Sequence, residues 1–174
     1  VGMGGATFPT QVKLSPPPGS KAEILIVNAV ECEPYLTSDH SLMLAKGEEI
    51  IVGVKILMTA IDVRRAVIGI ESNKPDAIKL MKKLAAKEQG IEVMPLKMRY
   101  PQGGEKQLID AVIRRQVKSG ALPISVGAVV QNVGTVFAVG LLASGLASTS
   151  VGAYAGSEIM NGLLHIRVPL WARR

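Results

Sequence analysis

The sequence predicts a protein of the α/β class, with a parallel sheet of about four strands and helices on both of its faces. Short, continuous apolar runs alternate along the chain with longer stretches of helical spacing, which is the pattern of βαβ units. Apolar residues make up 48% of the 174 residues but aromatic residues only 3%. That aliphatic balance suits a parallel sheet covered on both sides.

Four continuous apolar runs are the predicted strands, because a strand buried on both faces is apolar without alternation. The runs lie at residues 22–28, 66–70, 91–96 and 126–130. Pro95 has no amide N–H to donate to a neighbouring strand, so we expect the third strand at the edge of the sheet.

The predicted helices alternate with these strands, which implies right-handed βαβ connections. Residues 41–61 carry apolar side chains at helical spacing. Residues 75–89 begin with a proline in the first turn and end before Gly90. Residues 105–116 form a third helix, and residues 134–142 are interpreted as helix or loop.

The composition changes towards the end of the chain. Residues 143–156 are small and rich in serine, glycine and alanine, which indicates a linker or surface loop. Residues 163–168 alternate in polarity and are interpreted as a strand that starts a small β unit. We therefore expect a first domain over residues 1–142, followed by a linker and the start of a small β unit over residues 143–174.

Charge and residue content exclude several classes of site. The net charge of +6 comes from scattered basic pairs, and the few aromatic residues offer no stacking platform, so we expect no nucleic-acid binding. Cys32 is the single cysteine and cannot by itself hold an iron–sulfur cluster. His40 and His165 have no partner at metal-ligand spacing. We predict no metal site and no catalytic side chain, so a bound cofactor would carry any chemistry.

The first thirteen residues are the stretch around which the predicted site is organised. Gly2, Gly4 and Gly5 leave the backbone free to bring several N–H groups close to an anion. Phe8 adds a flat apolar surface, and Lys13 adds a cation. The combination suits a phosphate that carries an aromatic ring, while a flexible start with a turn explains the glycines alone equally well.

Polar, glycine-bearing turns follow three of the four predicted strands. Ligands of doubly wound sheets bind beyond the carboxyl ends of the strands, so these turns are the candidate binding loops. The turn at residues 71–75 is interpreted as ordinary turn and helix-capping chemistry, and a plain polar loop closed by Pro34 is the alternative for the first turn. The candidate residues in the three turns are Asn28, Glu31 and Glu33, then Tyr100, Gly103, Gly104 and Glu105, and finally Asn132 and Thr135.

Five motifs between residue 2 and about residue 139 resemble one known family. They are GMGGATFPT from Gly2, VNAVECEPY from Val27, GIESNKP from Gly69, YPQGGEKQL from Tyr100 and VQNVGT from Val130. With them the chain resembles the C subunit of the Rnf-type electron transport complex, which is similar to the FMN-bearing, NADH-oxidising subunit of respiratory complex I. The resemblance implies a Rossmann-like domain that binds FMN, accepts hydride from NADH and passes electrons singly to iron–sulfur clusters.

The resemblance assigns the candidate residues to parts of one ligand site. It implies that the FMN end of the site is held by Gly2, Gly4, Gly5 and Lys13, and that Phe8 stacks with NADH. Bonds to the flavin and its ribityl-phosphate tail are implied for Asn28, Glu31, Glu33, Asn132 and Thr135. Contacts with flavin and nicotinamide are implied for Tyr100, Gly103, Gly104 and Glu105.

The chain departs from the family pattern in three ways. Thr7 stands where the pattern has glycine, residues 143–160 match poorly, and the cysteine motifs of the family's cluster domain are absent. The chain also opens inside a motif and without an initiating methionine, so we expect a piece of a longer protein. The 4Fe-4S clusters are expected only in a part that this chain lacks.

The resemblance also implies partners and a location. It places the protein among the other subunits of a membrane electron-transport complex, peripherally on the cytoplasmic face of the bacterial inner membrane. One alternative is a cobalamin-reductase-like flavoprotein of a bacterial microcompartment, against which Tyr35 favours the Rnf type. The other is a non-catalytic docking module that no longer holds flavin.

Overall fold

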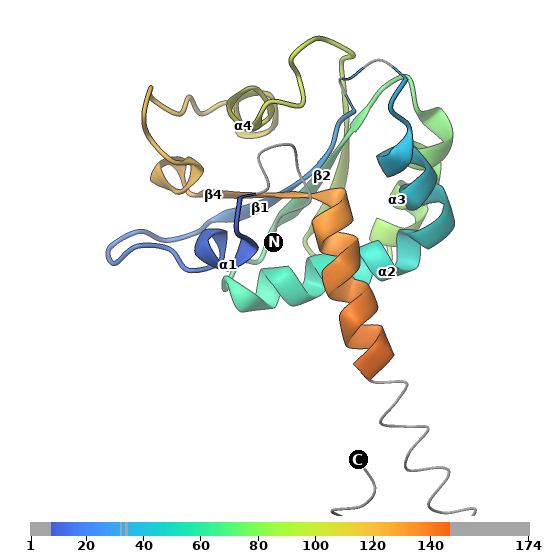
Figure 1. Ribbon diagram of the computed structural model, residues 1–174, viewed down its shortest axis with the longest axis horizontal. Coiled ribbons are helices and arrows are strands. Elements are labelled where there is room, and N and C mark those ends of the chain that lie inside the picture. Colours follow the sequence, from blue (N-terminus) through green and yellow to red (C-terminus); the bar gives the residue numbers. More distant parts are fainter. Residues whose placement is uncertain (1–7, 32, 34, 147–174) are drawn as a thin grey trace, which may run out of the picture. The chain divides into compact units, whose positions relative to one another are not determined.

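Four parallel strands form one sheet in the order β3-β2-β1-β4. The computed structural model describes residues 8–31, 33 and 35–146 (Figure 1). The strands are β1 (Ile24–Ala29), β2 (Ala66–Glu71), β3 (Ile91–Leu96) and β4 (Ala128–Asn132). The predicted α/β class is thus confirmed, and β3 with its Pro95 lies at an edge of the sheet as expected.

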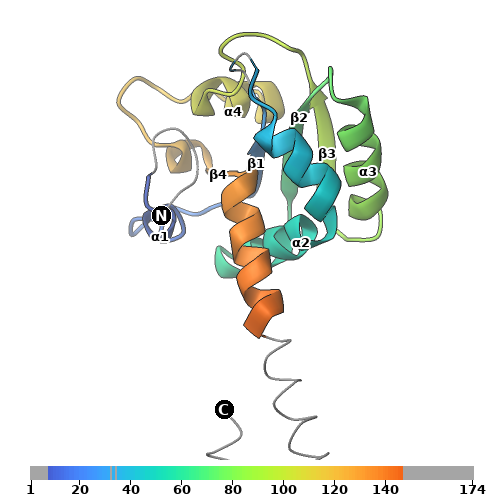
Figure 2. The same cartoon turned by 45° about the vertical axis from the view of Figure 1, so that its right-hand side comes forward.

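Helices cover both faces of the sheet (Figures 1 and 2). Their bounds are α1 (Thr10–Lys13), α2 (Ser38–Ala60), α3 (Pro75–Ala85), α4 (Glu105–Ile113) and the 3-10 turn η1 (Pro123–Val126), followed by an unlabelled helix over residues 133–146. Side chains of α2 and α3 pack on one face, and those of α4 pack on the other. None of the helices in the described part of the chain is long and apolar enough to cross a membrane.

The chain divides into two units, Val1–Gly140 and Leu141–Arg174. The first contains the sheet and every labelled helix. Of the second, the structure describes residues 141–146, which continue the helix from residue 133. Residues 143–146, predicted as the start of a linker, are therefore helical. The rest of the predicted linker and the predicted strand at 163–168 lie outside the described residues.

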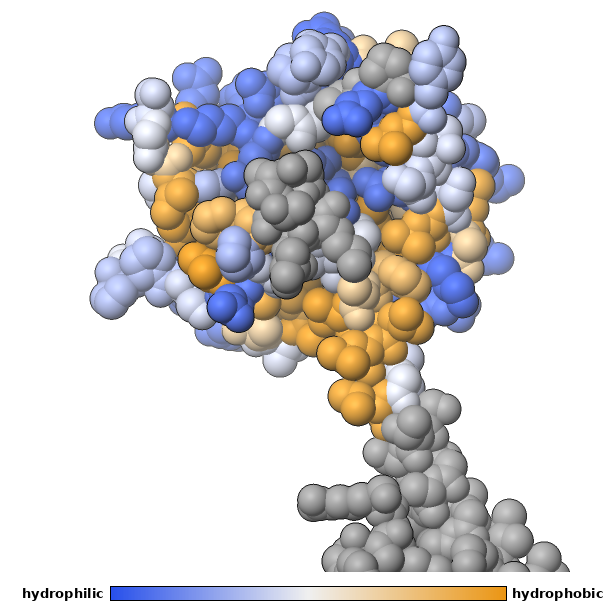
Figure 3. Space-filling view, viewed as in Figure 1, coloured by the Kyte–Doolittle hydropathy of each residue, from blue (hydrophilic) through white to orange (hydrophobic). Residues whose placement is uncertain are grey.

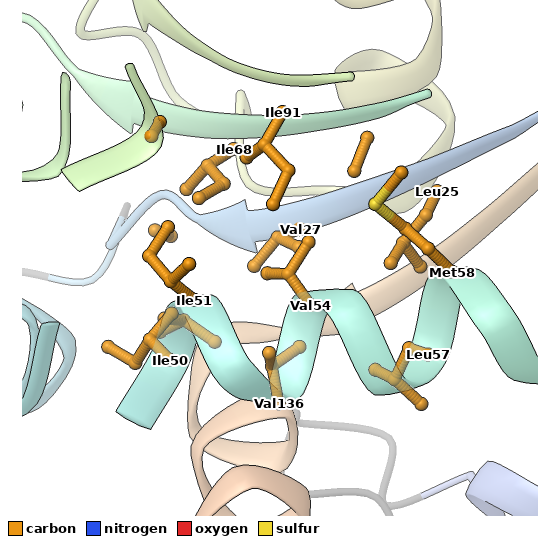
Figure 4. Packing of buried hydrophobic residues seen from close by; sticks show 14 of the residues in the cluster. Leu25, Val27, Ile50, Ile51, Val54, Leu57, Met58, Ile68, Ile91 and Val136 are labelled. Atoms are coloured by element: carbon orange, nitrogen blue, oxygen red, sulfur yellow. The ribbon is translucent and has the colours of Figure 1, made fainter. Parts of the chain in front are cut away.

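The core consists of two apolar layers, one on each side of the central strand β1. Leu25 and Val27 point towards the α2 layer and are fully buried, and Figure 4 shows Val27 above Val54 of α2. Ile24 and Ile26 belong to the other layer, with α4. Because successive residues of a strand point to opposite faces, a continuous apolar run is what a strand covered on both sides requires.

Apolar side chains also lie on the surface of the helix over residues 133–146 (Figure 3). Leu141, Leu142 and Leu146 are 48%, 65% and 61% exposed. The end of this helix therefore presents an apolar surface that the described residues do not cover.

Two glycines let this helix cross α2 at close range. A Cβ added to Gly53 of α2 would clash with the backbone oxygen of Val136, and one added to Gly140 would clash with the backbone oxygen of Glu49. Neither obstacle is a flexible side chain that could move aside. The crossing therefore depends on the absence of a side chain at both positions.

Substitution Gly53→Ala is expected to lower the free energy of unfolding by about 1–3 kcal/mol, because the two backbones must separate. The matched control is Gly145→Ala, which is also helical but whose added Cβ would meet no atom of the described residues within 4 Å. The control should change stability by no more than about 1 kcal/mol, in the favourable direction. Urea titration measures the free energy of unfolding of both variants. Equal changes in Gly53→Ala and Gly145→Ala would contradict the close crossing of the two helices.

Candidate functional site

The candidate site lies where the order of the strands reverses. The chain proceeds from β1 to β2 and β3 on one side and then returns to β4 on the other side of β1. The carboxyl ends of β1 and β4 therefore lie side by side at the point where the strand order reverses, and ligands of open α/β sheets bind at such points. Asn28 and Asn132 are register partners at this switch point.

Asn28 ties the end of β1 to the loop before α4. Its Oδ1 accepts the N–H of Val30 at 3.1 Å, which closes the turn after the strand. Its Nδ2 donates to the carbonyl oxygen of Gly103 at 2.9 Å. A primary amide has two N–H groups and two lone pairs on its oxygen. These two bonds use one N–H group and one lone pair of Asn28.

Asn132 has the corresponding role at the end of β4. Its Oδ1 accepts the N–H of Gly134 at 2.8 Å and so caps the helix over residues 133–146. Its Nδ2 donates to Oδ2 of Asp39, in the first turn of α2, at 3.2 Å. The two asparagines therefore connect the central strands with α4 and α2.

Lys13 and Glu105 meet beside the start of α4. The Lys13 Nζ lies 2.6 Å from Oε1 of Glu105 and 3.1 Å from the carbonyl oxygen of Val130 on β4. The same ammonium lies 5.9 Å from the centre of the Phe8 ring, within the range of a cation–π contact. Within the described part of the chain no side chain caps α4, which begins directly after Gly104. Its first N–H groups and the positive end of its dipole thus lie beside the Lys13–Glu105 ion pair.

A set of ionisable side chains, here called the buried charge network, lies on the other side of the switch point. It consists of the buried Glu31, Glu71 and Lys74 and the half-buried Asp39. The Lys74 ammonium pairs with Oε2 of Glu31, and the two side chains are 9% and 1% exposed. The other oxygen of Glu31 accepts the N–H of Asp39 at 2.6 Å and thus satisfies a free donor at the start of α2.

Burial raises the pKa of two carboxyls in this network. For Asp39 the loss of hydration is the largest cause, and the bond from Asn132 opposes it. For Glu71, which is 2% exposed, the loss of hydration again raises the pKa, and the nearby Lys74 opposes it. Three carboxyls thus share the single ammonium of Lys74.

The structure brings most of the predicted site residues to this edge but separates some of them. Lys13 bonds to Glu105 and Asn28 bonds to Gly103, and Glu31 and Asn132 are joined through Asp39. Glu33 is exposed, in contrast to Glu31, and Tyr100 is 83% exposed. Phe8 is 44% exposed and Thr135 is buried. Gly104 directly precedes α4, while Gly2, Gly4 and Gly5 lie outside the described residues.

The interpretation of residues 71–75 as a turn is confirmed, because the N–H of Lys74 donates to the carbonyl oxygen of Glu71 at 3.1 Å, but the expected helix capping is wrong. The residue at the N-cap of α3 is Lys74, and no side chain of the described residues caps that helix. Lys74 turns inward to Glu31 because a buried carboxylate without a cation would be far more costly than an uncapped helix end. The rule applied to the other strand ends, that polar residues there line a site, would have identified both Glu71 and Lys74.

Two other features are not part of this site. A shallow groove lined by residues 19–21 and 124–127 lies at the amino ends of β1 and β4, where Arg115 pairs with Glu23 at 2.6 Å. His40 lies 2.8 Å from Asp76. Among the described residues no group of three histidine, cysteine or acidic side chains is placed to hold a metal ion.

One protein family matches most of the chain. Its model, described as the Nuo51 FMN-binding domain, matches residues 1–141. A second family model, described as natural resistance-associated macrophage protein-like, matches residues 122–174, which is less than a third of the chain.

Similar curated proteins are the C subunits of ion-translocating complexes. That of the proton-translocating ferredoxin:NAD(+) oxidoreductase of Clostridium ljungdahlii is 52% identical over 139 residues, 80% of this chain and 30% of that protein. The corresponding protein of the Na(+)-translocating complex of Acetobacterium woodii is 50% identical over 135 residues, 78% of this chain and 30% of that protein. The chain thus spans less than a third of these relatives. The resemblance seen in the five motifs is confirmed.

Solved structures with the same fold include an NAD+-reducing NiFe-hydrogenase in two states. The H2-reduced form has a TM-score of 0.62 over 80% of this chain, and the air-oxidised form has 0.67 over 81%. Both are 26% identical to this chain, which covers 28% of the hydrogenase chain.

Substitution Glu71→Gln is expected to raise the free energy of unfolding at neutral pH. Because the pKa of Glu71 is raised, the folded protein binds the proton more tightly than the unfolded chain does. Ionisation of Glu71 therefore lowers stability as the pH rises above the ordinary pKa of 4.5, and the gain from glutamine should shrink as the pH falls towards that value.

Urea titrations from acidic to neutral pH measure this difference. The control is Glu92→Gln, because Glu92 forms an exposed ion pair with Arg65 and should change stability by less than about 1 kcal/mol. A loss of stability in Glu71→Gln at neutral pH would contradict the inference that the ionised Glu71 carboxylate lowers the stability of the fold.

Proposed function

The chain belongs to the family of the Nuo51 FMN-binding domain, and from that membership we propose that it is the electron-entry flavin module of an ion-translocating ferredoxin:NAD(+) oxidoreductase. In this proposal it binds FMN and accepts hydride from NADH. The observation that carries the proposal is the meeting of Lys13, Asn28 and Glu105 at the uncapped start of α4, beside the switch point of the sheet.

The residues at this edge fit the chemistry of FMN. A phosphate needs N–H donors and positive charge, and the start of α4 and Lys13 offer both. The polar edge of a flavin needs donors and acceptors, which the amides of Asn28 and Asn132 offer. In addition, Nε2 of Gln131 is a buried donor without a hydrogen-bond partner among the described residues. A bound ligand would satisfy such a donor.

Each side chain would contribute binding or orientation rather than acid–base chemistry. FMN, when bound, supplies hydride acceptance and the conversion from two-electron to one-electron transfer. Lys13 would balance ligand charge, and its present contact with Glu105 would keep that carboxylate beside the start of α4. Asn28 would fix the loop at Gly103. The half-exposed Phe8 ring would offer a flat surface to the nicotinamide.

The rest of the proposed reaction belongs to parts outside this chain. The relatives are about three times as long as the region matched here, so we place the 4Fe-4S clusters in the remaining part. Other subunits of the complex would hold the module at the cytoplasmic face of the membrane. The relatives favour this proposal over a cobalamin-reductase-like flavoprotein.

The direct test is calorimetric titration of FMN into the purified chain, followed by anaerobic addition of NADH. Saturable binding of one FMN per chain and bleaching of the flavin absorbance by NADH are expected. Failure to bind FMN, with the fold retained, would refute the proposal and favour the docking module instead.

Substitution Glu105→Gln is expected to slow NADH-dependent flavin reduction by about tenfold or more while FMN affinity changes by less than about threefold. A tenfold change corresponds to about 1.4 kcal/mol, the scale of a hydrogen bond to a charged group. Stopped-flow absorbance measures reduction, and fluorescence quenching measures FMN affinity.

The control for this substitution is again Glu92→Gln, which also removes one carboxylate from an ion pair but on the exposed surface of β3. It should change neither the rate of flavin reduction by NADH nor the affinity for FMN. Equal losses of reduction and FMN affinity in Glu105→Gln would show that Glu105 has no particular role towards the nicotinamide.

A further inference from the structure

Lys74 is a buried lysine at a position that the proposed function does not use. Only 9% of its side chain is exposed, and its ammonium pairs with Glu31. Lysine is rarely buried, because burial removes the hydration of its charge. A neighbouring carboxylate is needed to offset that cost. Lys74 comes from the turn between β2 and α3, whereas Glu31 follows β1. The pair therefore fastens two neighbouring loops of the carboxyl edge together.

A continuous series of contacts leads from this ion pair to the switch point. Oε1 of Glu31 holds the N–H of Asp39 at 2.6 Å, in the first turn of α2. Oδ2 of Asp39 in turn accepts Nδ2 of Asn132 at 3.2 Å. The other side of the Asn132 amide holds the N–H of Gly134 at 2.8 Å. Lys74 is thus connected with the side chain at the end of β4 through two carboxylates.

Removal of the Lys74 charge would disturb this series at its first member. Glu31 is almost completely buried, and a carboxylate at such a site that loses its cation either takes up a proton or moves towards water. Movement would break the bond to the Asp39 N–H and release the start of α2. The charged groups around Glu31 are Lys74, Asp39 and Glu71, and the next pair on α2 and α3 is His40 with Asp76.

We propose that Lys74 is a positioning residue of the ligand site. Its charge keeps the Glu31 carboxylate buried and bonded to the start of α2, and this arrangement fixes Asp39 and the side chain of Asn132 at the switch point. Lys74 itself touches no ligand, because its ammonium is already paired inside the protein. The consequence for FMN affinity rests on the proposed function, whereas the consequence for the Asn132 contacts does not.

The test is a double-mutant cycle on the whole chain, with Lys74→Met, Glu31→Gln and both together. Glutamine at position 31 is neutral and keeps an oxygen for the Asp39 N–H. In the presence of Glu31, Lys74→Met should weaken FMN binding about tenfold at neutral pH. When position 31 is glutamine, Lys74→Met should weaken FMN binding by less than about threefold. Equal factors in the two backgrounds would overturn the proposal.

Dependence on pH gives a second readout that a merely structural role would not produce. In Lys74→Met, a proton on Glu31 replaces the missing cation, so the loss of FMN affinity relative to the original protein should diminish as the pH falls. A loss that stays constant with pH would contradict the role of charge. The matched control is Lys55→Met, because Lys55 forms an exposed ion pair with Glu88 and should leave FMN affinity unchanged.

A third measurement does not depend on FMN. Amide hydrogen exchange, followed by NMR in the free protein, should accelerate at Asp39 and Gly134 in Lys74→Met but not in Lys55→Met. Unchanged exchange at both amides would overturn the proposal. Accelerated exchange in a chain that binds no FMN would support the positioning role while refuting the proposed function.

The cycle remains usable if Lys74→Met does not fold. Lys74→Gln is then substituted in both backgrounds, since its amide can still donate to Glu31. The expected loss of FMN affinity with Glu31 present is about threefold, and it should again disappear when position 31 is glutamine. An equal loss in both backgrounds overturns the proposal here as well.

Discussion

The parallel pairing of β1 with β4 is the interaction on which the arrangement of the carboxyl edge depends. It sets Asn28 beside Asn132. The Asn28 amide then holds the loop at Gly103, and the Asn132 amide holds Asp39 in the first turn of α2. β1 pairs with β2 on one edge and β4 on the other, and its Leu25 and Ile26 are buried against opposite helical layers. Burial of this aliphatic strand thus places its polar carboxyl end at the point where the strand order reverses.

Two kinds of charged contact flank this point, and they differ in exposure. Lys13 and Glu105 are about one-quarter and one-third exposed, so their ion pair is screened and easily exchanged for contacts with a ligand. Lys74 and Glu31 are withdrawn from water, so their pair is costly to break. The side of the site with Lys13 and Glu105 is therefore suited to binding a ligand. The side with Lys74 and Glu31 is suited to keeping the geometry of the site fixed.

Local sequence predicted most of the fold because its strongest signals act over short distances. All four strands lie within two residues of their predicted bounds, and α4 begins at the predicted Glu105. The ends of helices were less predictable: α3 stops at Ala85, while the last described helix continues to residue 146. Helix ends depend on packing and capping contacts that local spacing does not encode.

The sequence by itself determined the α/β class, the parallel sheet and the loops in which the candidate residues lie. Only the tertiary structure decided which of those residues work together. Glu31 and Glu33 have similar local sequence, yet one is buried and the other exposed. The difference arises from Lys74, forty-three residues from Glu31, because the position of a buried charge is set by the partner that the fold brings to it.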